Sequence, residues 1–196
     1  MIRFFDILFS ILGLIILLPL LFVCSILIAI DSRGGVFYFQ SRVGKHYRDF
    51  KLVKFRSMKV DADKQGGLTI GAHDGRITGI GYFLRKYKLD ELPQLINVLK
   101  GDMSLVGPRP DLQKYVDLYT DEEKIILTVR PGITDWASIE YINENEILGK
   151  SSDPEKTYVE VVMHAKIALN TRYIENMCIR EYFRILMKTA AKLIGN

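Results

Sequence analysis

Two adjacent carboxylates, Asp90 and Glu91, stand among several cations of the chain. Pro93 follows Asp90 by three residues, so a helix that starts here places Asp90 at or near its N-cap, with proline in its first turn. Such acids are stabilised by the helix dipole without any catalytic role. Alternatively, Arg85 and the neighbouring lysines favour the ionised form of Asp90, as a metal ligand or an anionic nucleophile requires. The pair is therefore a candidate catalytic site, with a helix cap as the alternative.

A single arginine stands between two prolines, Pro108 and Pro110. Proline fixes the backbone on either side, so Arg109 is presented with little backbone freedom, which suits bidentate binding of a phosphate. A rigid turn with an incidental arginine is the alternative. Lys54 and Arg56 alternate along a predicted strand, which places two cations on one face. That face either binds anions or is simply solvated.

Other signals for metal or nucleotide chemistry are weak. Asp61 and Asp63 form a DxD pattern, by which many glycosyltransferases hold a divalent metal on a diphosphate, but two acids at this spacing are common by chance. The sequence contains neither the glycine pattern of a dinucleotide fold nor that of a P-loop. Cys24 and Cys178 stand far apart and the first lies in an apolar run, so neither a disulfide nor a structural metal is expected.

The elements that must position these residues belong to one mainly α domain with a small β-hairpin, an α+β arrangement. The chain has 196 residues, 48% of them hydrophobic, which excludes a disulfide mini-protein and a disordered chain. The patterns predict a hairpin over 35–58, a helical turn and long loop over 59–81, helices over 82–100 and 111–129, and two helices over 154–194 separated near Asn176.

An apolar segment precedes this domain. Residues 7–30 contain no charged side chain, and 24 helical residues reach about 36 Å, enough for a hydrocarbon core of about 30 Å. Pro19 lies in its middle, where proline kinks or breaks a helix. The segment therefore either spans the membrane with a kink or enters and leaves on one side. A signal peptide is disfavoured, because the run is too long and ends without a small-x-small cleavage site.

Two groups of cations indicate how the chain meets a membrane. Residues 33–59 are rich in Lys and Arg, and by the positive-inside tendency the folded domain faces the cytoplasm. Near the end of the sequence, cations repeat every four residues and share one helical face: Arg180, Arg184, Lys188 and Lys192. That helix either lies in the lipid headgroup layer or is a core helix with a solvated face.

Taken in order, the motifs form a longer pattern that covers nearly the whole chain. After the apolar segment come Lys54-Phe55-Arg56-Ser57-Met58, Arg76-Ile77-Thr78, Phe83-Leu84-Arg85-Lys86, Leu89-Asp90-Glu91-Leu92-Pro93-Gln94-Leu95, Asn97 to Ser104, Val106-Gly107-Pro108-Arg109-Pro110 and Arg130-Pro131-Gly132-Ile133-Thr134. This sequence resembles the bacterial sugar transferases, the monotopic polyprenol-phosphate phosphoglycosyl transferases.

The resemblance implies an activity. Members transfer a phospho-sugar from a UDP-sugar to polyprenol phosphate, here undecaprenyl phosphate, with Mg²⁺, and release UMP. The resemblance implies that Asp90 is the nucleophile and a metal ligand, and that the reaction passes through a covalent aspartyl-phosphosugar on this residue. It also implies that Glu91 is a second catalytic residue. The residues assigned to substrate and phosphate binding are Lys54, Arg56, Arg85, Gln94, Arg109 and Arg130.

The resemblance also implies two parts of the chain and their surroundings. Residues 1–31 form a membrane-embedded re-entrant helix broken at Pro19, and residues 32–196 form a catalytic domain on the cytoplasmic face of the bacterial inner membrane. The expected partners are the UDP-sugar, polyprenol phosphate, membrane lipids and a second copy in a homo-oligomer, and not nucleic acid. Two residues depart from the family pattern, because Leu18 precedes Pro19 in place of Ser and Asp135 stands in place of Gly. The identity of the sugar stays open.

Two rival functions remain. A metal-dependent glycosyltransferase that uses Asp61 and Asp63 would release UDP in place of UMP. A non-catalytic membrane scaffold would bind acidic lipids through the cationic segments and show no turnover.

Overall fold

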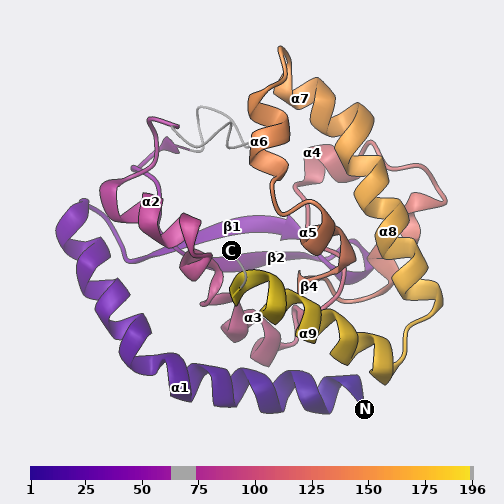
Figure 1. Ribbon diagram of the computed structural model, residues 1–196, viewed down its shortest axis with the longest axis horizontal. Helices are drawn as coiled ribbons and strands as arrows, with labels where there is room; N and C mark the ends of the chain where they lie inside the picture. The colour runs from indigo at the N-terminus through magenta and orange to yellow at the C-terminus, as the bar shows by residue number, and fades with distance from the viewer. Residues whose placement is uncertain (63–73, 195–196) are drawn as a thin grey trace.

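The computed structural model describes residues 1–62 and 74–194, and it is mainly helical with two small sheets, as predicted. Helix α1 (Ile2–Asp31) runs along the outside of the molecule, and the other elements gather within its bend (Figure 1). The elements that follow are β1 (Phe37–Val43), η1 (Lys45–Tyr47), β2 (Asp49–Phe55), α2 (Gly79–Lys86), η3 (Leu89–Glu91), α3 (Gln94–Lys100), β3 (Ser104–Val106), α4 (Gln113–Val116), η4 (Glu123–Thr128), β4 (Gly132–Thr134), α5 (Trp136–Glu140), α6 (Glu144–Gly149), α7 (Pro154–Thr157), η5 (Tyr158–Met163), α8 (His164–Glu175) and α9 (Ile179–Ile194).

Helix α1 is continuous over 30 residues, with Pro19 inside it. Proline removes one backbone hydrogen bond and crowds the preceding turn, which is the usual cause of a sharp helix kink. The ribbon of α1 is strongly bent (Figure 1). Where the sequence predicts a break at Pro19, the helix continues through this residue, and α1 is one bent helix. By length and composition α1 is able to cross a membrane, and no other helix in the described ranges is.

The N-terminal half of α1 is fixed to the domain through Asp6, which is 2% exposed. Oδ1 of Asp6 accepts hydrogen bonds from the Ser104 hydroxyl, the Leu105 backbone N–H and the Tyr182 hydroxyl, each at 2.9 Å. Nη1 of Arg3 lies 4.0 Å from the other carboxylate oxygen. A charge buried at this depth requires such partners, and here they tie α1 to both β3 and α9.

The C-terminal end of α1 contacts the same domain. Nη2 of Arg56 donates to the carbonyl oxygen of Ser32 at 2.7 Å and to its hydroxyl at 3.0 Å. The Asp31 carboxylate accepts from the backbone N–H of Ile80 at 3.1 Å, at the start of α2. Both ends of the bent helix are therefore held by one folded body.

Strands β1 and β2 form the predicted antiparallel hairpin, with Phe37 opposite Phe55 and Val43 opposite Asp49. Helix α3 packs along β2 through Asn97, whose Oδ1 accepts from the Val53 N–H at 2.9 Å. Nδ2 of Asn97 donates to the Lys51 carbonyl at 2.8 Å. This side chain bonds β2 as a neighbouring strand would, and it fixes β2 relative to the segment that precedes α3.

The helix predicted over 82–100 is wrong in detail, because the chain divides it into α2, the 3₁₀ helix η3 and α3. Lys88 adopts φ 56° in the left-handed region, which a right-handed helix does not continue. Pro93 is the N-cap residue of α3, so Asp90 lies earlier, inside η3, and caps no described helix. The predicted N-cap role of Asp90 is therefore wrong. The helix predicted over 111–129 is likewise only the two short helices α4 and η4.

The C-terminal helices follow the prediction more closely. Segments α7, η5 and α8 form one helical run over 154–175, in which η5 is a π-helix, and α9 begins at Ile179 after a break near Asn176. Tyr182 and Ile185 of α9 are fully buried, so one face of this helix belongs to the core.

A short parallel pair that the sequence patterns do not predict joins β3 to β4, with Ser104 beside Gly132 and Val106 beside Thr134. Gly107 and Gly132 approach so closely that a Cβ on Gly132 would lie 2.1 Å from the Gly107 nitrogen. Glycine is therefore required at this crossing. The crossing sets where the following residues, 108–110, leave the sheet.

Candidate active site

A cavity of about 380 Å³ opens between η3, β2, β4, α5 and α9, and we call it the reaction cavity. Five residues assigned from the sequence line it: Lys54, Arg85, Asp90, Glu91 and Arg109. The structure thus brings together segments from β2, α2, η3 and the residues after β3. Further lining cations are Lys88, Lys166 and Lys192.

Asp90 is 6% exposed and lines this cavity. In the part of the chain that the structure describes, no group donates a hydrogen bond to its carboxylate, so both oxygens are available to a ligand. Burial and the neighbouring Glu91 raise the pKa of Asp90, while Lys54 and Arg85 oppose that rise. Asp90 is therefore a buried, unpaired carboxylate in a cationic cavity.

Glu91 has the opposite environment. Nη1 of Arg109 donates to Oε2 of Glu91 at 3.1 Å, and Nη2 of Arg109 donates to Oε1. Nζ of Lys54 lies 3.3 Å from the same Oε1. Burial alone would raise the pKa of Glu91, but Arg109 and Lys54 hold it well below its ordinary value. Glu91 is consequently an ionised residue that organises two cations, and Asp90 is left to react.

Two structural features direct Lys54 and Arg109 towards Glu91. Asn97 fixes β2 against α3, as described above, and so places Lys54 next to η3. Arg109 follows the Gly107–Gly132 crossing and is flanked by prolines, which restricts its backbone. The fork of Arg109 binds Glu91, whereas the sequence predicts phosphate binding by this residue.

Asp135 is a site residue that the sequence analysis treats only as a departure from the family pattern. It is fully buried, and its Oδ2 accepts from the backbone N–H of Arg109 at 3.1 Å and from Nδ2 of Asn170 at 2.7 Å. Oδ1 accepts from the Ser138 N–H at 2.5 Å and so caps α5. The spacing of Asp135 and Ser138 is an N-cap signal that could have been found, but its link to Arg109 could not.

Three residues assigned to substrate binding do not line the reaction cavity. Arg56 is 7% exposed and bonds Ser32 at the end of α1. Gln94 is buried in α3, with its Nε2 lacking a partner among the described residues. Nε of Arg130 donates to the Gly101 carbonyl at 2.8 Å. The present contacts of Arg56 and Arg130 are structural, and substrate binding by these three residues stays a prediction.

The DxD pattern lies at the edge of the described chain. Asp61 is described and does not line the reaction cavity, whereas Asp63 falls outside the described residues, as does most of the predicted loop over 59–81. Within the described ranges, no three side chains among His, Cys, Asp and Glu are grouped as metal ligands.

Several known proteins are similar to this chain over most of its length. The chain is 36% identical to a UDP-N-acetylgalactosamine-undecaprenyl-phosphate N-acetylgalactosaminephosphotransferase of Aeromonas hydrophila over 195 residues, which cover 98% of this chain and 43% of that protein. It is 37% identical to a UDP-glucose:undecaprenyl-phosphate glucose-1-phosphate transferase of Xanthomonas campestris pv. campestris, covering 97% of this chain and 38% of that protein. The chain therefore spans less than half the length of these two relatives.

A third relative has a similar length. The exopolysaccharide production protein PSS of Rhizobium leguminosarum bv. phaseoli is 36% identical over 195 residues, which cover 95% of this chain and 92% of that protein. The family model described as bacterial sugar transferase matches residues 1–196. A match over this whole length shows that the chain belongs to the bacterial sugar transferase family.

Proposed function

We propose that this protein transfers a sugar 1-phosphate from a UDP-sugar to undecaprenyl phosphate, the first membrane step of exopolysaccharide or glycoconjugate synthesis. The observation that carries the proposal is the unpaired, buried Asp90 in a cationic cavity. The names of the Aeromonas and Xanthomonas relatives support the same two substrates.

The reaction we propose consists of two displacements. An oxygen of Asp90 forms a bond to the sugar-linked phosphorus, and the bond from that phosphorus to UMP breaks, so UMP leaves with the electron pair. A phosphate oxygen of undecaprenyl phosphate then attacks the same phosphorus and releases Asp90 as a carboxylate. Arg109 and Lys54, which Glu91 holds in place, lie where they neutralise charge on the transferring group.

We also propose Mg²⁺ as the cofactor. In proteins Mg²⁺ is usually held by one or two carboxylates together with substrate phosphates and water, and the free oxygens of Asp90 fit that donor set. Glu91 is already occupied by Arg109 and Lys54, so Asp90 is the residue that would hold the ion. When bound, the ion neutralises the diphosphate and assists departure of UMP.

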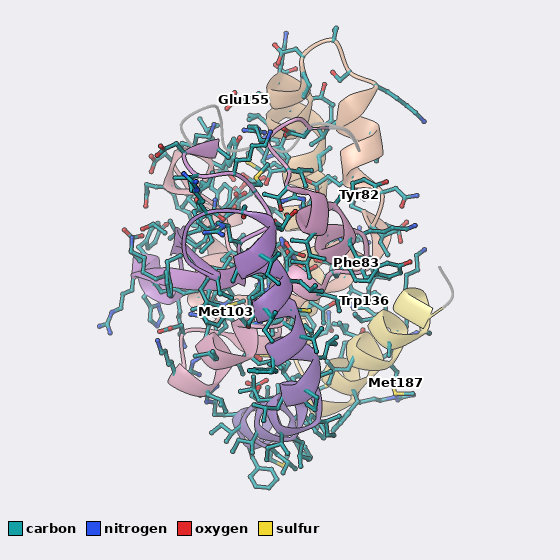
Figure 2. The ribbon with its side chains drawn as sticks, turned by 90° about the vertical axis from the view of Figure 1, so that its left-hand side faces the viewer. Tyr82, Phe83, Met103, Trp136, Glu155 and Met187 are labelled. Atoms are coloured by element: carbon teal, nitrogen blue, oxygen red, sulfur yellow. The ribbon has the colours of Figure 1, made fainter. Side chains whose placement is uncertain are left out.

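For the membrane, we propose that α1 enters and leaves on the cytoplasmic side of the bacterial inner membrane. The support is that both ends of α1 bond the same domain, through Asp6 and through Ser32. Exposed apolar side chains also stand on other elements: Tyr82, Phe83 and Met187 lie along one side of the molecule in Figure 2. Trp136 lies nearby, with Nζ of Lys188 5.1 Å from its ring centroid.

The decisive experiment measures the nucleotide released. The purified protein in lipid nanodiscs is mixed with Mg²⁺ and a panel of UDP-sugars, with and without undecaprenyl phosphate. We expect UMP as the product, and a stoichiometric burst of UMP without the acceptor, together with an Asp90 phosphosugar adduct by mass spectrometry. Release of UDP would favour a glycosyltransferase, and absence of turnover with every sugar would favour a scaffold.

Two variants accompany the assay. Asp90→Asn should abolish both the burst and turnover, because an amide neither attacks phosphorus nor supplies an anionic ligand. Asp117→Asn is the matched control, since Asp117 is an exposed carboxylate outside the reaction cavity. Near-native turnover by Asp90→Asn would refute the assignment of the nucleophile.

A further inference from the structure

A second cavity, of about 130 Å³, adjoins the reaction cavity, and we call it the side cavity. Arg109, Glu144 and Lys166 line both cavities. Nζ of Lys166 donates to Oε2 of Glu144 at 2.7 Å, so an ion pair and the Arg109 side chain form the boundary between the two spaces. A molecule whose charged end contacts Arg109 can therefore extend into either cavity.

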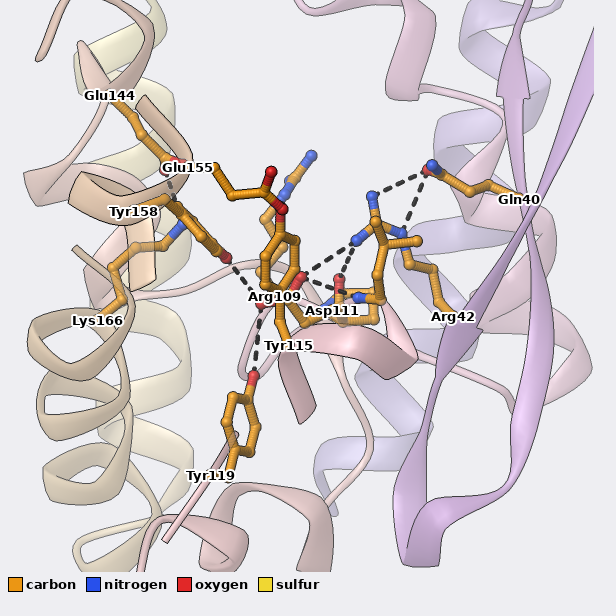
Figure 3. Close-up of polar contacts among 12 residues, drawn as sticks. Gln40, Arg42, Arg109, Asp111, Tyr115, Tyr119, Glu144, Glu155, Tyr158 and Lys166 are labelled. Atoms are coloured by element: carbon orange, nitrogen blue, oxygen red, sulfur yellow. Dashed lines mark hydrogen bonds and ion pairs between the residues drawn. The ribbon is translucent and has the colours of Figure 1, made fainter. Parts of the chain in front are cut away.

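The side cavity is lined by groups that hydrogen-bond hydroxyls. Oδ2 of Asp111 accepts from the Tyr158 hydroxyl at 2.7 Å and from the Tyr119 hydroxyl at 3.5 Å, as Figure 3 shows. Nη1 of Arg42 donates to Oδ1 of Asp111 at 3.4 Å. The 3.5 Å between the Tyr119 hydroxyl and Asp111 is at the upper limit of hydrogen-bond length, so this bond is weak. A ligand hydroxyl can therefore replace either partner with little loss of bonding energy.

One buried group in this wall lacks a partner. Asn170 lines the side cavity and is 4% exposed, and its Nδ2 donates to Asp135. Its Oδ1 is buried without a hydrogen bond to any described residue. Buried acceptors in folded proteins are nearly always satisfied. The unsatisfied oxygen therefore points to a ligand that carries a hydrogen-bond donor.

Aromatic rings complete the wall. The rings of Tyr115 and Tyr158 lie with their centroids 4.8 Å apart, and both residues line the side cavity. A cavity that combines ring surfaces with a carboxylate, an amide and hydroxyls suits a ligand with apolar faces and several hydroxyls. Arg42, Arg109 and Lys166 also line the side cavity, but each already bonds a carboxylate. A phosphate would in addition leave the acceptor oxygens of Asp111 and Asn170 unused, whereas sugar hydroxyls can donate to them.

We propose that the side cavity binds the hexose ring of the UDP-sugar, with Asp111, Tyr119 and Asn170 reading its hydroxyls. This inference rests on the proposed function. The phosphorus that Asp90 attacks stays bonded to the sugar, so the sugar must lie one ester linkage from the groups that bind that phosphate. Arg109 lines both cavities, so a phosphate bound by Arg109 in the reaction cavity has its attached sugar within reach of the side cavity.

The test separates sugar binding from catalysis. Tyr119→Phe removes one hydroxyl and keeps the ring, and Tyr158→Phe, which removes the other hydroxyl bonded to Asp111, is a second variant should the first fold poorly. Tyr173→Phe is the matched control, because Tyr173 is a buried tyrosine that lines neither cavity. The full-length protein in nanodiscs, carrying Asp90→Asn in every variant so that no phosphosugar adduct forms, is titrated with UDP, UDP-glucose and UDP-galactose, and then with the two N-acetylated counterparts. Equilibrium dissociation constants are measured for each.

We expect Tyr119→Phe to change the ratio of Kd values between sugar epimers by roughly 3- to 10-fold, the effect of one hydrogen bond. The Kd for UDP should stay unchanged, and the control should change neither. An equal loss for UDP and for every UDP-sugar would place the nucleoside in the side cavity and overturn the proposal, as would unchanged ratios in both variants. Failure of the proposed function looks different: UDP-sugars bind, and no UMP is released.

Discussion

At the scale of single residues, two chemically similar neighbours have opposite environments. Glu91 is bonded by Arg109 and Lys54, whereas Asp90 is buried next to the negative charge of Glu91. Their pKa values are thereby moved in opposite directions, Asp90 upward and Glu91 well downward. Divergent pKa values within one pair are a common way to divide roles between two acids.

The raised pKa of Asp90 predicts a pH dependence. Asp90 must be ionised to attack, so kcat/KM should fall as pH decreases through that raised pKa. Glu91→Gln removes a negative neighbour and should move this acidic limb to lower pH in the residual activity. Arg85→Gln removes a positive neighbour and should move it to higher pH. Shifts of the same sign in pH–rate profiles of both variants would contradict this assignment.

The fork of Arg109 predicts that its geometry matters as well as its charge. Arg109→Lys keeps the charge but cannot bond both oxygens of Glu91. We expect kcat to fall roughly 100-fold, the usual effect of losing one aligned donor to a transition state. Steady-state kinetics measure this, with Arg172→Lys as the matched control, because Arg172 is exposed on α8 and lines neither cavity. Equal kinetics of the two variants would reduce Arg109 to part of a rigid turn.

At the scale of elements, short segments hold the site because buried polar side chains connect them. Asp135 joins β4 and α5 to the Arg109 backbone and to α8, and Asn97 joins α3 to β2. Strands of three residues have little stability of their own. These side-chain bonds therefore do part of the work that longer ladders do in other folds.

Asp135→Asn should weaken this connection. Its amide can still cap α5, but its NH₂ then faces two donors, the Arg109 N–H and Nδ2 of Asn170. Losing that acceptor should cost about 1–3 kcal/mol of unfolding free energy and lower kcat/KM. Thermal denaturation and kinetics test it against Asp153→Asn, the same change at the N-cap of α7, outside both cavities. An unchanged Tm and an unchanged kcat/KM would show that the bonds of Asp135 to Arg109 and Asn170 contribute neither to stability nor to activity.

The contacts of Asp6 provide a test of our proposal that both ends of α1 lie on one side of the membrane. Asp6→Leu removes the acceptor of three donors, and it also removes the charge that opposes transfer of the first turn across the membrane, a cost of about 2.5–3.5 kcal/mol at the centre of the bilayer. We expect a cysteine introduced at residue 2 to become reactive from outside in a measurable fraction of molecules.

Two control variants separate the effect of the Asp6 charge from the effect of its hydrogen bonds. Asp6→Asn loses the charge but keeps an oxygen that can accept the same bonds, and Tyr182→Phe keeps the charge but loses one donor. A cysteine at residue 45 should be labelled only from the cytoplasmic side in every variant. Pro19→Ala, which straightens the helix, should act in the same direction as Asp6→Leu. If residue 2 stays inside in all of them, neither Asp6 nor Pro19 determines the topology.

At the scale of the whole molecule, cations gather where two anionic substrates must meet. The chain has a formal net charge of +4, and Lys54, Lys88, Lys166 and Lys192 all line the reaction cavity. A cavity of one sign concentrates ligands of the opposite sign, and salt screens this attraction. KM for the UDP-sugar should therefore rise with salt. Lys192→Gln should reduce that slope, while Lys124→Gln, remote from the cavity, should not.

The sequence predicts local elements better than the contacts between them. The apolar run of α1, the hairpin and the final two helices show long regular patterns, and each is found where expected. The pairing of β3 with β4 is not predictable in this way, because three residues show no periodicity. Likewise Asp90 and Arg109 are marked by their neighbours, whereas Asp135 and Asn170 become site residues only through contacts between distant segments.

The bond between Asp6 and Tyr182 has a consequence for biosynthesis. Its two residues are 176 positions apart. At a synthesis rate of about 5–20 residues per second, the apolar helix leaves the ribosome on the order of 10 s before its partner in α9 exists. During this interval the nascent helix meets the membrane without the contact that later holds it. In the arrangement that we propose, the first commitment to one side of the bilayer comes from the bend of α1 and its flanking charges, and the bond to Tyr182 stabilises that arrangement afterwards.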